Sequence, residues 1–174
     1  MSSSQAHDQK ALPLTHPIDV ATIKPDGLVV NFEATETERA GLAKLFDIPS
    51  VVKLNASFKL TRKGSRVKVR GDVSGIVTRR CVLSVEPFDM DFHEAVSVDY
   101  DEPRDAAESE DDQEDGPDPI IDGQIDLGAL AAEFAALSLD PYPKKPGVVF
   151  DYHEDDDDKP PSPFAKLAAI KSKS

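Results

Sequence analysis

Apolar and polar residues alternate along two consecutive segments in the middle of the chain. In residues 52–60 the even-numbered positions are apolar and the positions between them are polar or basic; in residues 66–80 valines recur at odd-numbered positions around Gly71 and Gly75. A period of two with one polar face predicts a half-buried antiparallel strand in each case. We therefore expect a hairpin with its turn at residues 62–65 and a bend or bulge at one of the glycines. The residues expected on its buried face are Val52, Leu54, Ala56, Phe58, Leu60, Val67, Val69, Val73 and Val77.

Further strands are predicted on both sides of this hairpin. Residues 18–23 and 28–32 are short apolar-rich runs, separated by a Pro-Asp-Gly turn at residues 25–27. We expect these two runs to pair with each other as a second hairpin. Residues 90–100 alternate again, although the pattern does not decide whether Ala95 or Val96 faces inward. Residues 148–150 are expected to add a last short strand.

Two segments carry helix signals. Thr35 and Glu38 form a capping-box pattern, which predicts a helix over residues 36–46 that ends before Pro49. Asp126 is expected to cap a second helix over residues 127–139, in which apolar residues fall along one face.

These elements predict an α+β domain in which a curved antiparallel β-sheet, partly barrel-like, packs with the two main helices. The domain is expected to span residues 14–150, after a disordered tail of residues 1–13. Residues 101–119 have almost no apolar side chains, so we expect a disordered acidic insert there. Residues 151–174 are expected to form an acidic, proline-rich linker and a short amphipathic helix at 163–171.

Charge is sorted by position along the chain. The 174 residues carry a formal net charge of −13, but residues 51–80 contain nine basic residues against Asp72 alone, a net charge of +8. Residues 99–118 contain eleven acidic residues against Arg104 alone, a net charge of −10. This asymmetry favours a surface that faces a polyanion, together with an acidic segment that can compete for that surface.

Composition also indicates in which cellular compartment the protein is expected. The single cysteine excludes an intrachain disulfide and fits a reducing cytosol. No apolar run approaches the ~20 residues of a membrane span, and the first ten residues contain no apolar stretch typical of a signal peptide. We expect a cytoplasmic protein without membrane contact.

Patterns of catalytic and metal-binding residues are weak. The four histidines are scattered at no ligand spacing, and neither a phosphate loop nor a nucleophile elbow is present. Cys81 follows two arginines, which lower the pKa of an exposed thiol, but a cysteine at the end of a valine-rich strand is expected to be buried. We therefore expect no enzyme activity, no metal, no cofactor and no small-molecule substrate.

The polar face of the central hairpin is the candidate site. Basic side chains gathered on one face can contact RNA phosphates, with an affinity that falls as salt rises. The alternative is an ordinary solvated face, or lysines that protect a sheet edge. Phe58 is expected to point inward, which leaves no aromatic platform for reading the bases of single strands. The candidate phosphate contacts are Lys53, Lys59, Arg62, Lys63, Arg66, Lys68, Arg70, Arg79 and Arg80.

A set of motifs follows this hairpin. Residues 78–87 read Thr-Arg-Arg-Cys-Val-Leu-Ser-Val-Glu-Pro, and Phe-His-Glu follows at 92–94. Further motifs lie at 125–133, at 138–147 and at 163–171. In this order, over about residues 17–171, the chain resembles the YceD-like family of large ribosomal RNA subunit accumulation proteins. The motif positions singled out are Cys81, Glu86, Pro87, Leu127, Leu130, Pro141, Tyr142 and Pro143.

The resemblance implies a non-enzymatic role in large-subunit ribosomal RNA accumulation or processing, and so in ribosome biogenesis. Family members often carry further cysteines beside the equivalent of Cys81 and in the proline-rich segment; this chain has neither, so no metal role is expected here. The motif residues are expected to shape a strand end and a turn.

The partners implied are ribosomal RNA, a pre-ribosomal particle or a ribosomal protein. Two alternatives stay open. One is a protein-interaction adaptor that binds a basic partner through its acidic segments without contacting RNA. The other is a nuclease or RNA-modifying enzyme.

Overall fold

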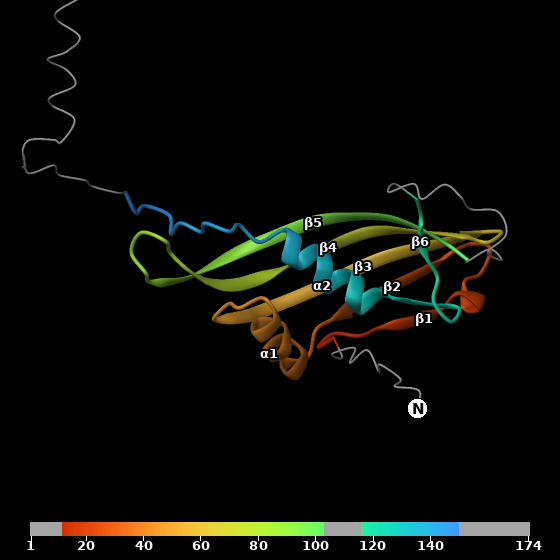
Figure 1. Ribbon diagram of the computed structural model, residues 1–174, viewed down its shortest axis with the longest axis horizontal. Helices are drawn as coiled ribbons and strands as arrows, with labels where there is room; N and C mark the ends of the chain where they lie inside the picture. Colours follow the sequence, from red (N-terminus) through yellow and green to blue (C-terminus); the bar gives the residue numbers. More distant parts are fainter. Residues whose placement is uncertain (1–11, 103–115, 150–174) are drawn as a thin grey trace, which may run out of the picture.

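A long, open β-sheet forms the body of the protein (Figure 1). The computed structural model describes residues 12–102 and 116–149. The sheet has the strand order β2-β3-β4-β5-β6 and is antiparallel except for β6, which runs parallel to β5. Its strands are β2 (Leu28–Glu33), β3 (Ser50–Lys63), β4 (Arg66–Arg80), β5 (Pro87–Asp101) and β6 (Asp118–Pro119). The α+β class is confirmed, whereas the sheet is mixed rather than wholly antiparallel, and the partly barrel-like closure is not confirmed.

A second, two-stranded sheet joins distant parts of the chain. It pairs β1 (Pro17–Asp19) with β7 (Gln124–Asp126) in antiparallel fashion, and the 3-10 helix η1 (Val20–Thr22) follows β1. The expected hairpin of residues 18–32 is therefore wrong, because β1 pairs with β7 and β2 pairs with β3. The turn itself is present: the Gly27 amide donates to the Lys24 carbonyl at 2.8 Å, and Gly27 has φ of 92°.

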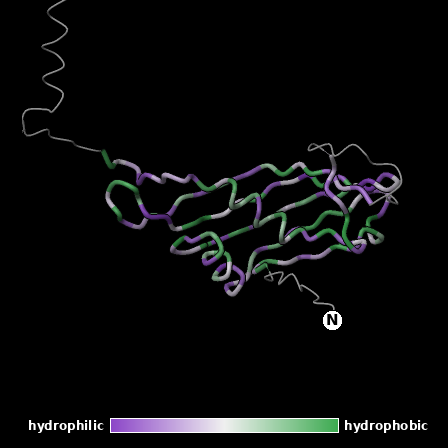
Figure 2. The backbone as a smooth tube through the Cα atoms, viewed as in Figure 1, coloured by the Kyte–Doolittle hydropathy of each residue, from purple (hydrophilic) through white to green (hydrophobic). Residues whose placement is uncertain are grey.

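The central hairpin buries one face and exposes the other. Val67, Val69, Val73 and Val77 of β4 are at most 1% exposed, and Leu54, Ala56, Phe58 and Leu60 of β3 are buried opposite them. Hydrophobic and hydrophilic residues alternate along these strands in Figure 2. On β5, Val96 is the inward residue and Ala95 is exposed.

A β-bulge changes the facing of one residue at the start of β3. The register with β4 shifts between Val51 and Lys53, so Val51 is buried while Val52 and Lys53 are both exposed. Placing Val52 on the buried face was therefore wrong, because the inserted residue displaces the two-residue period. The bulge lies on β3 and not at a glycine: β4 pairs with β5 without a break past Gly71 and Gly75.

Those two glycines face inward where neighbouring backbone lies very close. A Cβ atom at Gly71 would overlap the Ser57 carbonyl oxygen, and a Cβ atom at Gly75 would overlap the Lys53 carbonyl oxygen. Both contacts are with the backbone of β3. Glycine is needed at these positions because the backbone of β3 approaches β4 too closely for a side chain.

Two helices cover the inner face. The helix α1 (Glu36–Leu45) packs beside the start of β3, and α2 (Leu127–Leu137) crosses the sheet (Figure 1). The Thr35–Glu38 capping box is present as predicted, with the Thr35 amide donating to Glu38 Oε2 at 2.7 Å. Asp126 caps α2 as predicted, and its Oδ1 atom also accepts the His16 amide at 2.7 Å. One carboxylate therefore holds both the helix start and the N-terminal segment.

Several expected boundaries change. Asp101 ends β5 and residues 118–119 form β6, so the ends of the expected insert 101–119 belong to the sheet. Residues 148 and 149 are not in a strand. Residues 1–11 of the expected tail 1–13, the middle of the insert at 103–115, and the linker and helix of residues 151–174 lie outside the described residues.

We expect Gly71→Ala to destabilise the fold by about 1–3 kcal/mol, because the new methyl group meets backbone that cannot rotate away. Urea unfolding measures the change as a lower midpoint. Ser74→Ala is the matched control, since Ser74 lies on the same strand and its side chain faces outward. Equal midpoints for the two variants would show that the strands have room at Gly71.

Candidate nucleic-acid interface

The outer face of the sheet, away from α2, carries most of the predicted cations. Side chains directly opposite each other across antiparallel strands share a face, so the register assigns each one. Lys59 is opposite Arg70 and Lys63 is opposite Arg66, in alternation with the buried residues. Seven of the nine predicted cations lie on this outer face: Lys53, Lys59, Lys63, Arg66, Lys68, Arg70 and Arg80.

The other two predicted cations lie elsewhere. Arg62 is opposite the buried Val67, and its guanidinium binds the Glu102 carboxylate at 2.8 Å and the Val20 carbonyl at 3.2 Å. Arg79 is opposite Phe88, and it donates to the Asp140 carbonyl at 2.8 Å. Both arginines tie separate segments of the chain together. The expectation that they share the polar face of the hairpin was wrong, while their contact with phosphate stays a prediction.

Five of the cations form one compact group beside the β3–β4 turn. We call it the cationic cluster; its members are Lys59, Lys63, Arg66, Lys68 and Arg70. Hydrophilic residues are concentrated at this end of the sheet in Figure 2. Two cross-strand pairs within the cluster, Lys59–Arg70 and Lys63–Arg66, place like charges directly opposite each other, which disfavours folding.

Aspartates of β5 lie along one side of the cationic cluster. Asp99 accepts from Arg70 at 2.7 Å and lies 3.3 Å from the Lys68 ammonium, while Asp101 lies 3.3 Å from Arg66 Nε. Hydrogen bonding from Arg70, and then from Lys68, lowers the pKa of Asp99 below its usual value. Asp99 and Asp101 belong to the acidic segment 99–118 that was expected to compete for the cationic surface, and both occupy outward positions of β5.

The β3 lysines differ from the β4 cations in this respect. Within residues 12–102 and 116–149, Lys53, Lys59 and Lys63 form no ion pair, and all three are exposed. The three β4 cations each have an aspartate partner, yet their side chains stay 45–60% exposed. The cationic cluster thus combines free lysines with partly neutralised cations.

Most of the motif residues gather at the opposite end of the hairpin, around Cys81. The Cys81 amide donates to the Glu86 carbonyl and the Val85 amide donates to the Cys81 carbonyl, both at 2.9 Å, which closes the β4–β5 turn. The segment 138–149 lies against this turn, because the Val82 amide donates to the Pro143 carbonyl at 2.9 Å. Lys145 Nζ also lies 2.8 Å from Glu86 Oε2.

The remaining motif residues have structural positions or are exposed. Leu127 and Leu130 are buried in α2, and Pro143 is buried beside the turn. Pro87 begins β5, and Pro141 is exposed. Tyr142 is 71% exposed and lies off the sheet, in the segment 138–149.

Cys81 is buried, at 2% exposure, and its sulfur faces Ser84 in the β4–β5 turn. The Ser84 amide lies 3.5 Å from its sulfur. Hydrogen bonding from the Ser84 side chain, and then from the backbone of Lys145 and Ser84, lowers the pKa of the Cys81 thiol from 9.0 to about 6. The thiol was expected to be buried and it is; its low pKa comes from these donors rather than from the preceding arginines.

Comparison with known proteins identifies the family. The family model described as "Large ribosomal RNA subunit accumulation protein YceD" matches residues 69–171, more than half of the chain. The chain belongs to the YceD family. The YceD match begins within β4 and includes Arg70, Asp99 and the turn around Cys81, but it does not include β3. No curated protein and no solved structure matches the chain.

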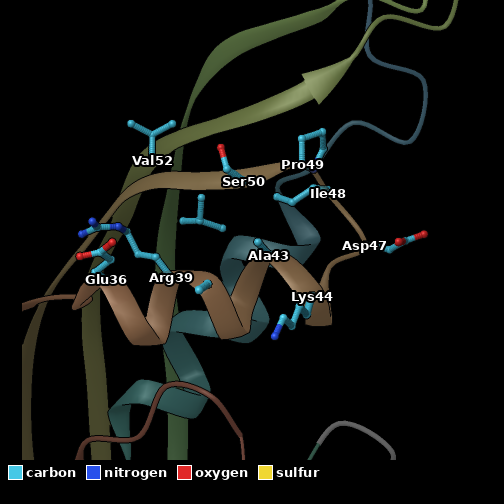
Figure 3. Close-up of a pocket in the computed structure, with 11 residues that line it drawn as sticks. Glu36, Arg39, Ala43, Lys44, Asp47, Ile48, Pro49, Ser50 and Val52 are labelled. Carbon is cyan, nitrogen blue, oxygen red and sulfur yellow. The ribbon is translucent and has the colours of Figure 1, made fainter.

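A separate groove opens between α1 and the start of β3 in this YceD protein (Figure 3). Its volume is about 560 Å³, and its lining is partly apolar, with Ala43, Ile48 and Val52, and partly charged, with Glu36 and Arg39.

No three His, Cys, Asp or Glu side chains gather as metal ligands in the described ranges, 12–102 and 116–149. In the same part of the chain, neither helix is long and apolar enough to cross a bilayer.

Folding is expected to be more favourable at pH 9 than at pH 6 because of Cys81. The folded thiol loses its proton near pH 6 and the unfolded thiol near pH 9, so folding releases a proton between these values and stability rises with pH. Urea midpoints for the native protein and for Cys81→Ser, measured across this range, give the contribution by difference. The single cysteine also makes the ultraviolet absorbance of the thiolate a direct titration. A difference that does not change between pH 6 and pH 9 would contradict the lowered pKa.

Proposed function

We propose that this protein is a non-enzymatic, cytoplasmic factor for large-subunit ribosomal RNA accumulation that acts by binding RNA through the cationic cluster. The family description supports the connection with large-subunit ribosomal RNA. The cluster supports the mode of action, because exposed lysines and arginines on one face can neutralise several phosphates together.

The observation that carries this proposal is the register, which sets Lys59 opposite Arg70 and Lys63 opposite Arg66. Direct opposition of like charges costs stability, so folding alone does not favour it. Edge protection does not account for the lysines either, since β3 and β4 are interior strands of the sheet. Solubility is already supplied by a net charge of −13. A bound anion would reduce the repulsion between these cations, so the arrangement favours anion binding.

The net negative charge of the protein restricts where an anion such as RNA can bind. The protein carries a net charge of −13, whereas the cationic cluster is a local group of positive side chains at one end of the outer face. The Debye length is about 8 Å at physiological salt, so only the nearby cluster acts strongly on a bound phosphate. RNA is therefore expected to bind in one place, with an affinity that depends steeply on salt.

Replacing both Lys59 and Lys63 by glutamine is expected to weaken RNA binding and to reduce the slope of log affinity against log salt by about 2, one for each lost phosphate contact. Fluorescence anisotropy with a large-subunit ribosomal RNA fragment, titrated at several salt concentrations, measures both quantities. The matched control is Lys44→Gln with Lys144→Gln, which removes the same charge from α1 and from the segment beside the Cys81 turn.

Each outcome of this titration is informative. RNA binding lost in the test variant and kept in the control supports the proposal, provided that the RNA is recovered intact after incubation with Mg²⁺. Equal slopes for the two variants would move the contact away from β3. No RNA binding, together with capture of a ribosomal protein, would instead support an adaptor that never touches RNA.

Asp99→Asn is expected to lower stability and to strengthen RNA binding. Loss of the carboxylate leaves Lys68 and Arg70 without their partner, which costs up to about 1 kcal/mol in partly exposed pairs, and the freed cations raise RNA affinity about three- to tenfold. Urea unfolding and RNA titration measure the two effects. Asp91→Asn is the control, because Asp91 shares the strand and face of Asp99 but lies about 27 Å away along β5. Tighter binding by both variants, or by neither, would show that Asp99 does not restrain the cluster.

A further inference from the structure

The aromatic side chains of the main sheet all point away from the outer face. Phe32, Phe58, Phe88, Phe92 and Tyr100 occupy inward register positions on β2, β3 and β5. His93 is the one ring on the outer face of the described strands, and its Nε2 atom lies 3.8 Å from the Asp72 carboxylate. Proteins that bind unpaired bases generally stack them on aromatic side chains. The outer face offers no such platform beside the cationic cluster.

The arginines of the cluster are also restrained. Arg70 donates to Asp99 and to the Val69 and Val98 carbonyls, and Arg66 Nε lies 3.3 Å from Asp101, so each guanidinium already has a carboxylate on one side. Among the described residues of the cluster, the cations without an ion pair are Lys59 and Lys63, which attract phosphates as point charges. The chemistry left exposed is therefore directed at a sugar–phosphate backbone.

The rest of β3 extends this chemistry into a row. Lys53 and Lys63 are ten residues apart on the same strand, about 33 Å along its axis. Between them, Asn55, Ser57 and Thr61 also face outward. Their uncharged polar groups can exchange hydrogen bonds with phosphate oxygens and 2′-hydroxyls. The nearest carboxylates to the middle of this row are Asp72 of β4, opposite Ser57, and Glu33 of β2, opposite Asn55, so phosphates are expected to contact the row mainly at its lysines.

We propose that the outer face of β3 and β4 binds the backbone of double-helical RNA, without reading its sequence. This inference rests on the proposed function and specifies its partner. A duplex keeps its bases stacked and presents phosphates and 2′-hydroxyls at its surface, which are the groups that this face can satisfy. A single strand would place its unstacked bases on a face whose one ring within the described strands, His93, lies beside Asp72 and outside the cationic cluster.

The test compares an RNA duplex of roughly 20 base pairs, long enough to cover the ~33 Å row, with each of its single strands, chosen to lack internal pairing. Anisotropy titrations at low and physiological salt are expected to show the duplex binding at least about tenfold more tightly than either strand. A second duplex of scrambled sequence is expected to bind equally well. The Lys59→Gln, Lys63→Gln variant is expected to lose the preference, while Lys44→Gln, Lys144→Gln keeps it.

The outcomes separate this inference from the function on which it rests. Single strands that bind as tightly as the duplex, through the same lysines, would overturn the duplex preference and leave RNA binding in place. Single-strand binding that disappears in Tyr142→Ala, but not in the lysine variant, would move the contact to the exposed tyrosine beside the Cys81 turn and overturn both. Absence of binding to any RNA at low salt would also overturn both.

Discussion

The two-residue alternation of the β3–β4 hairpin is the constraint on which the rest of the structure depends. Its inward valines and Phe58 build the surface on which the helices pack, and they are almost completely buried. Once those side chains face inward, the lysines and arginines between them have to face outward, on two adjacent interior strands. The core and the cationic cluster are therefore two consequences of one pattern: a one-residue slip in register would bury the charges and expose the valines.

This arrangement brings a conflict that β5 partly resolves. Like charges face each other at Lys59–Arg70 and Lys63–Arg66, and the next strand places Asp99 and Asp101 beside the β4 cations. Such exposed pairs contribute little stability each, but they lower the local positive potential while the chain folds. The lysines of β3 are one strand further away and keep their charge free. Ion pairs with β5 therefore stabilise the fold but lower the affinity of the β4 cations for anions. The β3 lysines, which have no such pairs, keep their affinity for anions.

Local signals in the sequence were enough to locate most of the fold. The alternation within each strand, the Thr35–Glu38 capping box and the Asp126 cap depend only on residues close in sequence. All three were predicted. The failures required information from distant residues: β1 pairs with β7, Arg62 reaches Glu102, and Arg79 reaches Asp140. The bulge at Val52 failed for a different reason, because one inserted residue reverses the facing that alternation assigns. The Asp99 partnership was present in the sequence, in the polar half of the β5 pattern.

The two ends of the β4–β5 hairpin show how rigidity supports a charged surface. At the Cys81 end, backbone hydrogen bonds, the Lys145–Glu86 pair and the segment 138–149 hold the turn closed. At the other end, Arg62 of β3 binds the Val20 carbonyl of η1 and the Glu102 carboxylate on the inner side of the sheet. These contacts fix the end of β3 that carries part of the cluster. Binding loses less conformational entropy when the contact groups are already in place. Flexible lysine side chains still lose their own freedom on contact, but the backbone beneath them does not have to be ordered. The two arginines that were expected to bind phosphate therefore matter to the surface in another way, because Arg62 supports the cluster and Arg79 supports the turn.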